Sequence, residues 1–200
     1  MYLAILILAG GLVRIGMICQ TAAISRDGIR YIQLARQFDT MAPQTLARST
    51  DFHLGYSAAL RGMYRLLRGM GCSEEVETWD LAGQLVSLLS ALLATAGLYA
   101  FGVLLLANAH LCFMGVLLFT LGRKWSVIGS DVLSDSTVMC CQIWALVLSL
   151  ICYRYLLRGN HGKALLNALG VGFLAGLGYL VRPEGLLVMA LSIPLWAHTW

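Results

Sequence analysis

The chain has 200 residues, of which 59% are hydrophobic and only 12% are charged, and its mean hydropathy is +0.77. A soluble domain averages about 25% charged residues, so the composition predicts an integral membrane protein. The net charge of +4 does not indicate a nucleic-acid partner, because the basic residues are spread along the chain and form no tail or cluster.

Apolar segments for about five to six membrane spans follow one another, since a spanning helix needs about 20 apolar residues. The uncharged run 81–122 is too long for one crossing, so we expect it to fold back at Asn108–His110. Gly172 and Gly176 form a G-x-x-x-G pair, which predicts close packing with a neighbouring helix. The candidate spans are 3–23, two within 81–122, 136–153, 164–181 and a last segment from Gly185.

The two ends of the chain each leave a choice. Residues 21–23 (Thr-Ala-Ala) resemble a signal-peptide cleavage region, but no basic region precedes the apolar run and the run is long enough to span. We therefore expect a retained first helix. The last segment is still apolar at Trp200. We expect either that the chain is the N-terminal part of a longer protein or that its last helix is an interfacial stub.

A polar loop, 25–80, separates the first span from the rest and carries seven Arg and seven Asp or Glu residues. Within it, 28–38 and 57–70 show apolar residues at helical spacing with polar or basic residues opposite. Both patterns predict amphipathic helices in the membrane interface, with arginines near anionic head groups.

Alternation of the spans would place 25–80, 123–135 and 182–184 on one side of the membrane. That side would hold all ten acidic residues and ten Lys or Arg residues, against three on the other side, with Arg14 inside the first span. Counting basic residues would make the charged side cytoplasmic, whereas the short basic loop 154–163 marks the opposite side as cytoplasmic. Both orientations stay open at this point.

Acidic and basic residues at the span ends are candidates for a site on the charged side, because ionisable groups that face a bundle interior are often functional. Each has a simpler alternative. Asp27 could instead be the N-cap of the helix that follows it. Arg182 could instead be an anchor at the membrane boundary that pairs with Glu184, and His53 could be an ordinary loop residue. The candidates are Asp27 with His53, Asp131 with Asp135, and Arg182 with Glu184.

Four short motifs carry a family resemblance: D-G-I-R-Y at 27–31, H-L-G-Y-S at 53–57, S-D-V-L-S-D at 130–135 and R-P-E-G at 182–185. In this order and spacing they resemble the N-terminal half of GT-C glycosyltransferases, of the bacterial protein mannosyltransferase, aminoarabinose transferase and lipopolysaccharide-core glycosyltransferase type. The second motif lacks the family's prolines, and Ser136 stands where a proline usually follows the third. The resemblance covers nearly the whole chain.

The resemblance implies an all-α, polytopic membrane helix bundle of about five to six spans, with a long extracytoplasmic first loop that carries the interfacial helices. Residues 1–200 would form a single transmembrane domain, the N-terminal part of a GT-C module, with 25–80 as its first extracytoplasmic loop. The expected location is the bacterial cytoplasmic membrane, with the active site facing outward.

The implied activity is transfer of a sugar from a polyprenyl-phosphate donor to a lipid, glycan or protein acceptor, without a cofactor or a metal. Asp27 would be the general base, Arg182 and His53 would bind the phosphate, and Asp135 would hold the acceptor or orient an arginine. The residues expected to bind substrate are His53, Tyr31, Tyr56, Asp131, Asp135, Arg182 and Glu184.

Two other functions stay open. A transporter or flippase for a lipid-linked or anionic substrate would place ionisable groups near the membrane midplane, where Arg14 is the candidate. A truncated, inactive GT-C homologue would account for the missing prolines.

Overall fold

The computed structural model describes residues 1–20 and 24–197, and all elements in these ranges are helical. Four of the helices are long and apolar enough to cross a membrane, which confirms the expectation of an integral membrane protein. They are α1 (Tyr2–Gln20), α5 (Val76–Leu106), α8 (Asp135–Leu157) and α9 (His161–Val181).

Two further apolar segments are shorter than a membrane crossing requires. They are α6 (Ala109–Leu121) and the pair of η1 (Pro183–Leu186) with α10 (Leu187–Ala197). The 13 residues of α6 rise only about 20 Å, against about 30 Å for the bilayer core. The expected count of five to six spans is therefore not confirmed. The expected span ends at 21–23 and 198–200 lie outside the described residues.

The turn between α5 and α6 lies where the sequence predicted a hinge. Ala107 adopts the left-handed conformation (φ 52°), which ends α5. Asn108 then caps α6, its side chain accepting a hydrogen bond of 3.0 Å from the backbone N–H of Leu111.

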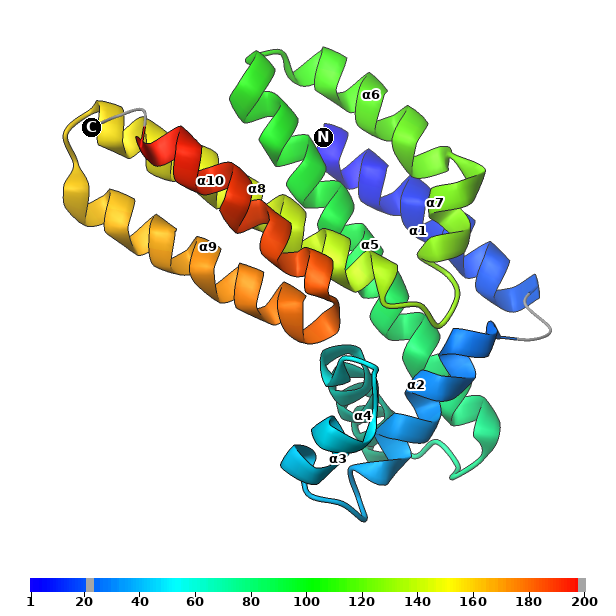
Figure 1. The fold of residues 1–200 in the computed structure, drawn as a ribbon. Helices are drawn as coiled ribbons and strands as arrows, with labels where there is room; N and C mark the ends of the chain where they lie inside the picture. Colours follow the sequence, from blue (N-terminus) through cyan, green and yellow to red (C-terminus); the bar gives the residue numbers. More distant parts are fainter. Residues whose placement is uncertain (21–23, 198–200) are drawn as a thin grey trace.

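The long helices form two groups that are joined where α5 packs against α8 (Figure 1). One group contains α8, its antiparallel neighbour α9, and α10; the other contains α1, α5 and α6. The short polar helices lie together at one end of the molecule. These are α2 (Arg26–Gln37), α3 (Pro43–Ser49) and α4 (Leu54–Gly69), and α7 (Arg123–Ile128) connects α6 to the start of the third motif.

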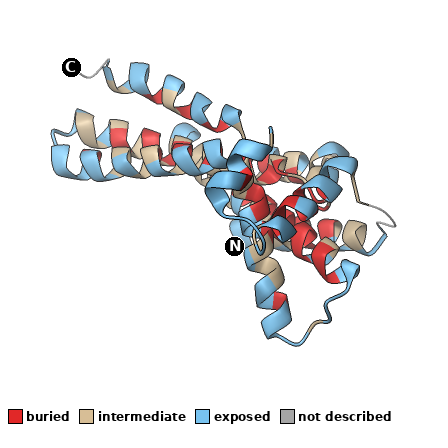
Figure 2. Ribbon diagram, turned by 60° about the horizontal axis from the view of Figure 1, so that its bottom comes forward, coloured by how far each residue is buried: buried red, intermediate tan, exposed pale blue. Residues whose placement is uncertain are grey.

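The polar end is built on the first turns of α5. This helix has 31 residues and is about 46 Å long, roughly 16 Å more than the bilayer core. Trp79, near its start, is buried and stacks on Tyr64 of α4 with 3.6 Å between ring centroids. Tyr31 and Ala35 of α2 and Leu60 of α4 belong to the same buried cluster, which appears in red in Figure 2.

The apolar faces of α2 and α4 are thus covered by protein. The first turns of α5 bury these apolar residues, while the predicted position of both helices in the membrane interface stays a prediction. The helix positions themselves are close to the predicted 28–38 and 57–70.

The arginines of α4 pair with acidic residues of the same loop, whereas the sequence suggested anionic lipid head groups. Arg61 and Arg65 both bind Asp39, which follows α2, and Arg68 binds Glu74 at 2.5 Å. The hydrogen bond from Arg61 holds the pKa of Asp39 below its usual value. The carboxylate therefore stays charged at neutral pH and links α2 to α4.

The close contacts of α9 do not involve the expected G-x-x-x-G pair. A Cβ added to Gly172 or Gly176 would have no described atom within 4 Å, so this part of the prediction is wrong. The approach occurs instead at Gly170, which lies against the Leu148 side chain of α8, and at Gly178, which lies against Gly185.

Candidate functional site

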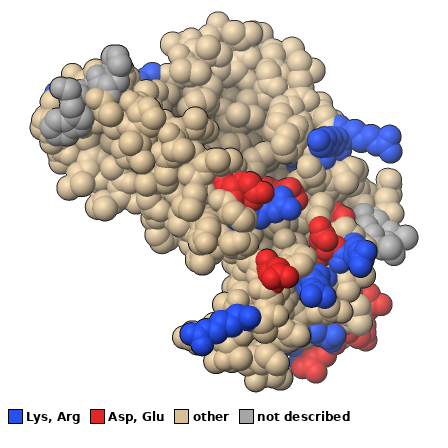
Figure 3. All heavy atoms as spheres, in the orientation of Figure 1, with Lys and Arg blue, Asp and Glu red and all other residues tan. Residues whose placement is uncertain are grey.

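Three chain segments that are far apart in the sequence meet at the polar end. The backbone N–H of Ser25 donates to Asp131 Oδ1 (3.3 Å), and the hydroxyl groups of Tyr31 and Ser134 lie 2.9 Å apart. In the same place, Arg182 Nη1 donates to Asp135 Oδ1 at 2.6 Å. On the face shown in Figure 3, acidic and basic side chains gather over the centre and lower end, whereas the upper body is largely uncharged.

Glycines of three of the four motifs hold these segments in close contact. A Cβ added to Gly28 would lie 2.8 Å from Val132 Cβ, and one added to Gly55 would lie 2.6 Å from the Leu180 carbonyl oxygen. At Gly185 the added atom would be 2.1 Å from the backbone of Gly178. Since real Cβ atoms do not approach so closely, each motif needs its glycine for packing. The motifs were recognisable in the sequence, but the packing role of their glycines was not.

Asp27 lies in the first turn of α2 but does not cap the helix. Ser25 is the N-cap, and its hydroxyl accepts a 3.2 Å hydrogen bond from the backbone N–H of Gly28. The alternative prediction of Asp27 as N-cap is therefore wrong. Asp27 is exposed, and within 1–20 and 24–197 its carboxylate makes no hydrogen bond or ion pair. It is available to a ligand, at a helix end that favours negative charge.

Arg182 and Asp135 form the ion pair of the site, with each side chain 36% exposed. The alternative prediction had paired Arg182 with Glu184. Within the part of the chain that is described, the Glu184 carboxylate makes no ion pair, and its backbone carbonyl accepts a hydrogen bond from Gln142 (2.6 Å). The 3₁₀ turn that begins at Pro183 separates the two side chains, and Arg182 reaches the first turn of α8.

Tyr31 and Tyr56, expected to line a sugar pocket, are 5% and 0% exposed, and their rings meet edge to face at 4.9 Å. Tyr56 donates to the Gly83 carbonyl (3.0 Å) and lies 2.9 Å from the Ser87 hydroxyl, which donates to the Leu133 carbonyl. Burial raises the pKa of Tyr56, so the phenol stays protonated. These contacts position the third motif, and sugar binding by either tyrosine stays a prediction.

Tyr56→Phe is expected to lower the free energy of unfolding by about 0.5–1.5 kcal/mol, the usual net value of a hydrogen bond. Thermal unfolding in detergent measures this, with Tyr99→Phe as the control. The Tyr99 hydroxyl has no hydrogen bond to another described residue, and its loss should be neutral. Equal stabilities of the two variants would contradict a positioning role for Tyr56.

His53 and Asp131 have local partners. The His53 ring packs edge to face on Tyr179 of α9, with 5.3 Å between centroids. Besides Ser25, the Asp131 carboxylate accepts a 2.7 Å hydrogen bond from the backbone N–H of Val132. Asp131 therefore joins the third motif to Ser25, the N-cap of the helix that carries the first motif, while ligand binding by His53 and Asp131 stays a prediction.

An apolar crevice of about 450 Å³ adjoins the polar site. It follows directly after Arg182 in the chain and is lined by Pro183, Glu184, Leu186, Leu187 and Ala190. Polar groups next to an apolar crevice suit a ligand with a charged head and a hydrocarbon chain. Within the described residues, no group of three or more His, Cys, Asp or Glu residues is placed to hold a metal ion.

No family model, no curated protein and no solved structure matches the chain. The resemblance to GT-C glycosyltransferases therefore depends on the four motifs themselves.

Proposed function

We propose that the chain is a membrane glycosyltransferase that moves a sugar from a polyprenyl-phosphate carrier to a lipid, glycan or protein acceptor. The observation that carries the proposal is the meeting of the four motifs at one end of an apolar bundle. There Asp27 has a carboxylate without a partner among the described residues, and Arg182 is a partly exposed cation. The active site faces outward from the bacterial cytoplasmic membrane, with the short basic loop 154–163 inside.

The proposed reaction needs a base and a cation. Asp27 accepts the proton of the acceptor hydroxyl or amine, whose oxygen or nitrogen bonds to the anomeric carbon as the bond from that carbon to the phosphate oxygen breaks. The phosphate leaves with the bonding electrons, and Arg182 stabilises its charge. A guanidinium has five N–H donors, so Arg182 retains donors for the phosphate beside its bond to Asp135. The crevice at 183–190 receives the isoprenoid chain.

Donor binding by variants of the ion pair tests this proposal. Arg182→Gln removes the cation and is expected to weaken binding of a polyprenyl-phosphate sugar at least about 10-fold, because a hydrogen bond to a charged group contributes about 1.5–3 kcal/mol. Asp135→Asn, the matched control, removes the ion pair but keeps the cation, and binding should persist. Titration of the purified protein with a fluorescent donor measures both. An equal loss of donor binding in the two variants would contradict phosphate binding by Arg182 and would indicate that the ion pair has a structural role only.

Arg14 favours a second function, a transporter for an anionic or lipid-linked substrate. It is 1% exposed within α1, and a buried cation in a span often marks a transport path. Its guanidinium donates to the carbonyls of Gly10 (3.1 Å) and Trp125 (3.5 Å), which joins α1 to α7. Movement of donor lipid across vesicles without sugar transfer, lost in Arg14→Met, would support the transporter.

A further inference from the structure

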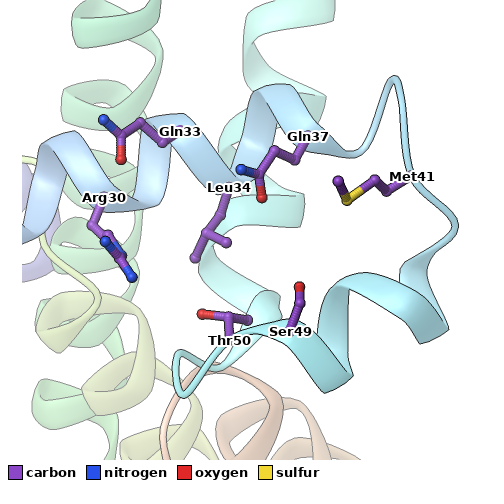
Figure 4. Close-up of a pocket in the computed structure, with 7 residues that line it drawn as sticks. All are labelled: Arg30, Gln33, Leu34, Gln37, Met41, Ser49 and Thr50. Carbon is purple, nitrogen blue, oxygen red and sulfur yellow. The ribbon is translucent and has the colours of Figure 1, made fainter.

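A polar cleft opens between α2 and the end of α3, beside the site described above (Figure 4). Its volume is about 320 Å³, at the lower end of the range of about 300–1,000 Å³ for ligand pockets. Arg30, Leu34 and Gln37 project from α2 toward Ser49 and Thr50 on the opposite wall. Gln33 and Met41 complete the lining.

The lining groups suit a hydroxylated ligand. Most ligand pockets are predominantly apolar, whereas this one presents a guanidinium, two carboxamides and two hydroxyls. The side-chain amides of Gln33 and Gln37 have no hydrogen bond to another described residue, and each offers both a donor and an acceptor. Such groups match the alternating donor and acceptor character of sugar hydroxyls, and the Leu34 side chain offers an apolar contact for the face of a sugar ring.

Arg30 gives the cleft its charge. Its guanidinium lies over the Phe52 ring, 5.7 Å from the centroid, which supports the side chain without using its hydrogen-bond donors. Within the described residues Arg30 has no acidic partner, unlike Arg61, Arg65 and Arg68 of α4. A forked, unpaired cation at the edge of a hydroxyl-binding cleft matches a carboxylate or phosphate group.

Three of the residues of α2 that line the cleft lie on the same side of the helix as Asp27. Residues 27, 30, 34 and 37 are spaced at i, i+3, i+7 and i+10, which places them on one side of α2. Arg30 lies about 4.5 Å and Gln37 about 15 Å along the helix axis from Asp27. A ligand in the cleft would therefore extend along α2 toward the candidate base.

We propose that the cleft formed by Arg30, Gln33, Gln37, Ser49 and Thr50 binds a sugar unit that carries an anionic substituent, as part of the acceptor. This assignment of an acceptor site rests on the proposed glycosyltransferase function. The binding of an anionic sugar in the cleft does not depend on transfer and is measured separately.

Saturation-transfer NMR of the full chain in nanodiscs tests the proposal, with glucose 6-phosphate, glucose and inorganic phosphate as probes. Glucose 6-phosphate should bind best, and Gln37→Leu and Arg30→Gln should each weaken its binding at least about 10-fold. Gln44→Leu and Arg48→Gln are the matched controls, because both residues are exposed on α3 and do not line the cleft. The controls should bind like the wild type.

The outcomes separate the cleft from the catalytic proposal. Equal binding of glucose 6-phosphate by all variants would contradict the proposed sugar site. The same conclusion would follow if inorganic phosphate bound as tightly as glucose 6-phosphate and Gln37→Leu did not weaken the binding of either. Weaker binding of glucose 6-phosphate by Gln37→Leu and Arg30→Gln, with binding of the polyprenyl-phosphate donor unchanged, would support the proposed sugar site. Sugar binding in the cleft of a protein that binds no donor would keep the cleft as a glycan site and contradict the transferase.

Discussion

Asp27→Asn is expected to lower sugar transfer at least about 100-fold, while donor binding and thermal stability stay at wild-type values. General-base catalysis typically contributes about 10²–10⁴ in rate, and the amide cannot accept the proton. The side chain is exposed, and the N-cap hydrogen bond belongs to Ser25, so the substitution should leave the fold unchanged. Transfer of labelled sugar by protein reconstituted in vesicles measures the effect.

Glu77→Gln is the control for this experiment, because it neutralises another exposed carboxylate of the same loop, in the first turn of α5. Its transfer rate should match the wild type. A rate in Asp27→Asn within a few-fold of the control would contradict the assignment of the base, whereas loss of donor binding in Asp27→Asn would assign the residue to the donor site.

Gly185→Ala is expected to destabilise the protein more than Tyr56→Phe does. The added methyl group would lie 2.1 Å from the Gly178 carbonyl carbon and 2.4 Å from the Tyr179 nitrogen. Both are backbone atoms and cannot rotate away, so η1 must move from α9. Overpacking typically costs about 1–3 kcal/mol. Because Arg182 lies at this junction, donor binding should fall together with the unfolding temperature.

Gly176→Ala is the matched control, since Gly176 lies on α9, the helix that Gly185 contacts, with no described atom within 4 Å of an added Cβ. Alanine favours a helix over glycine by about 1 kcal/mol, so this variant should be as stable as the wild type or more stable. Unfolding in detergent, followed by circular dichroism, compares the two. Similar unfolding temperatures for both variants would contradict the close contact between η1 and α9.

The helix periods and turn signals predicted α2, α4 and the turn at Asn108 because local patterns determine these elements. Apolar residues at i, i+3, i+4 and i+7 predict a helix, whether protein or membrane covers its apolar face. Asparagine is a favoured helix cap. The alternation of spans also anticipated that the three charged segments would meet.

Other features depend on contacts that no local pattern carries. The start of α5 was missed because Glu77 and Asp80 lower its hydropathy, although no helix breaker separates them from the apolar run. The choice of Asp135 as partner of Arg182 depends on how α8 and α9 pack. The polar cleft needed α3, a seven-residue helix too short to show a clear period. Gln33 and Gln37 were recognisable only as the polar face of α2.

Sugar transfer by the reconstituted wild-type protein is the most direct test of the proposed function, with a panel of labelled polyprenyl-phosphate sugars and a cell-envelope acceptor fraction. An active glycosyltransferase should move label from one or more of these donors to the acceptor over time, with release of polyprenyl phosphate. Donor binding without transfer to any acceptor would contradict an active glycosyltransferase and favour an inactive homologue or a carrier of the lipid.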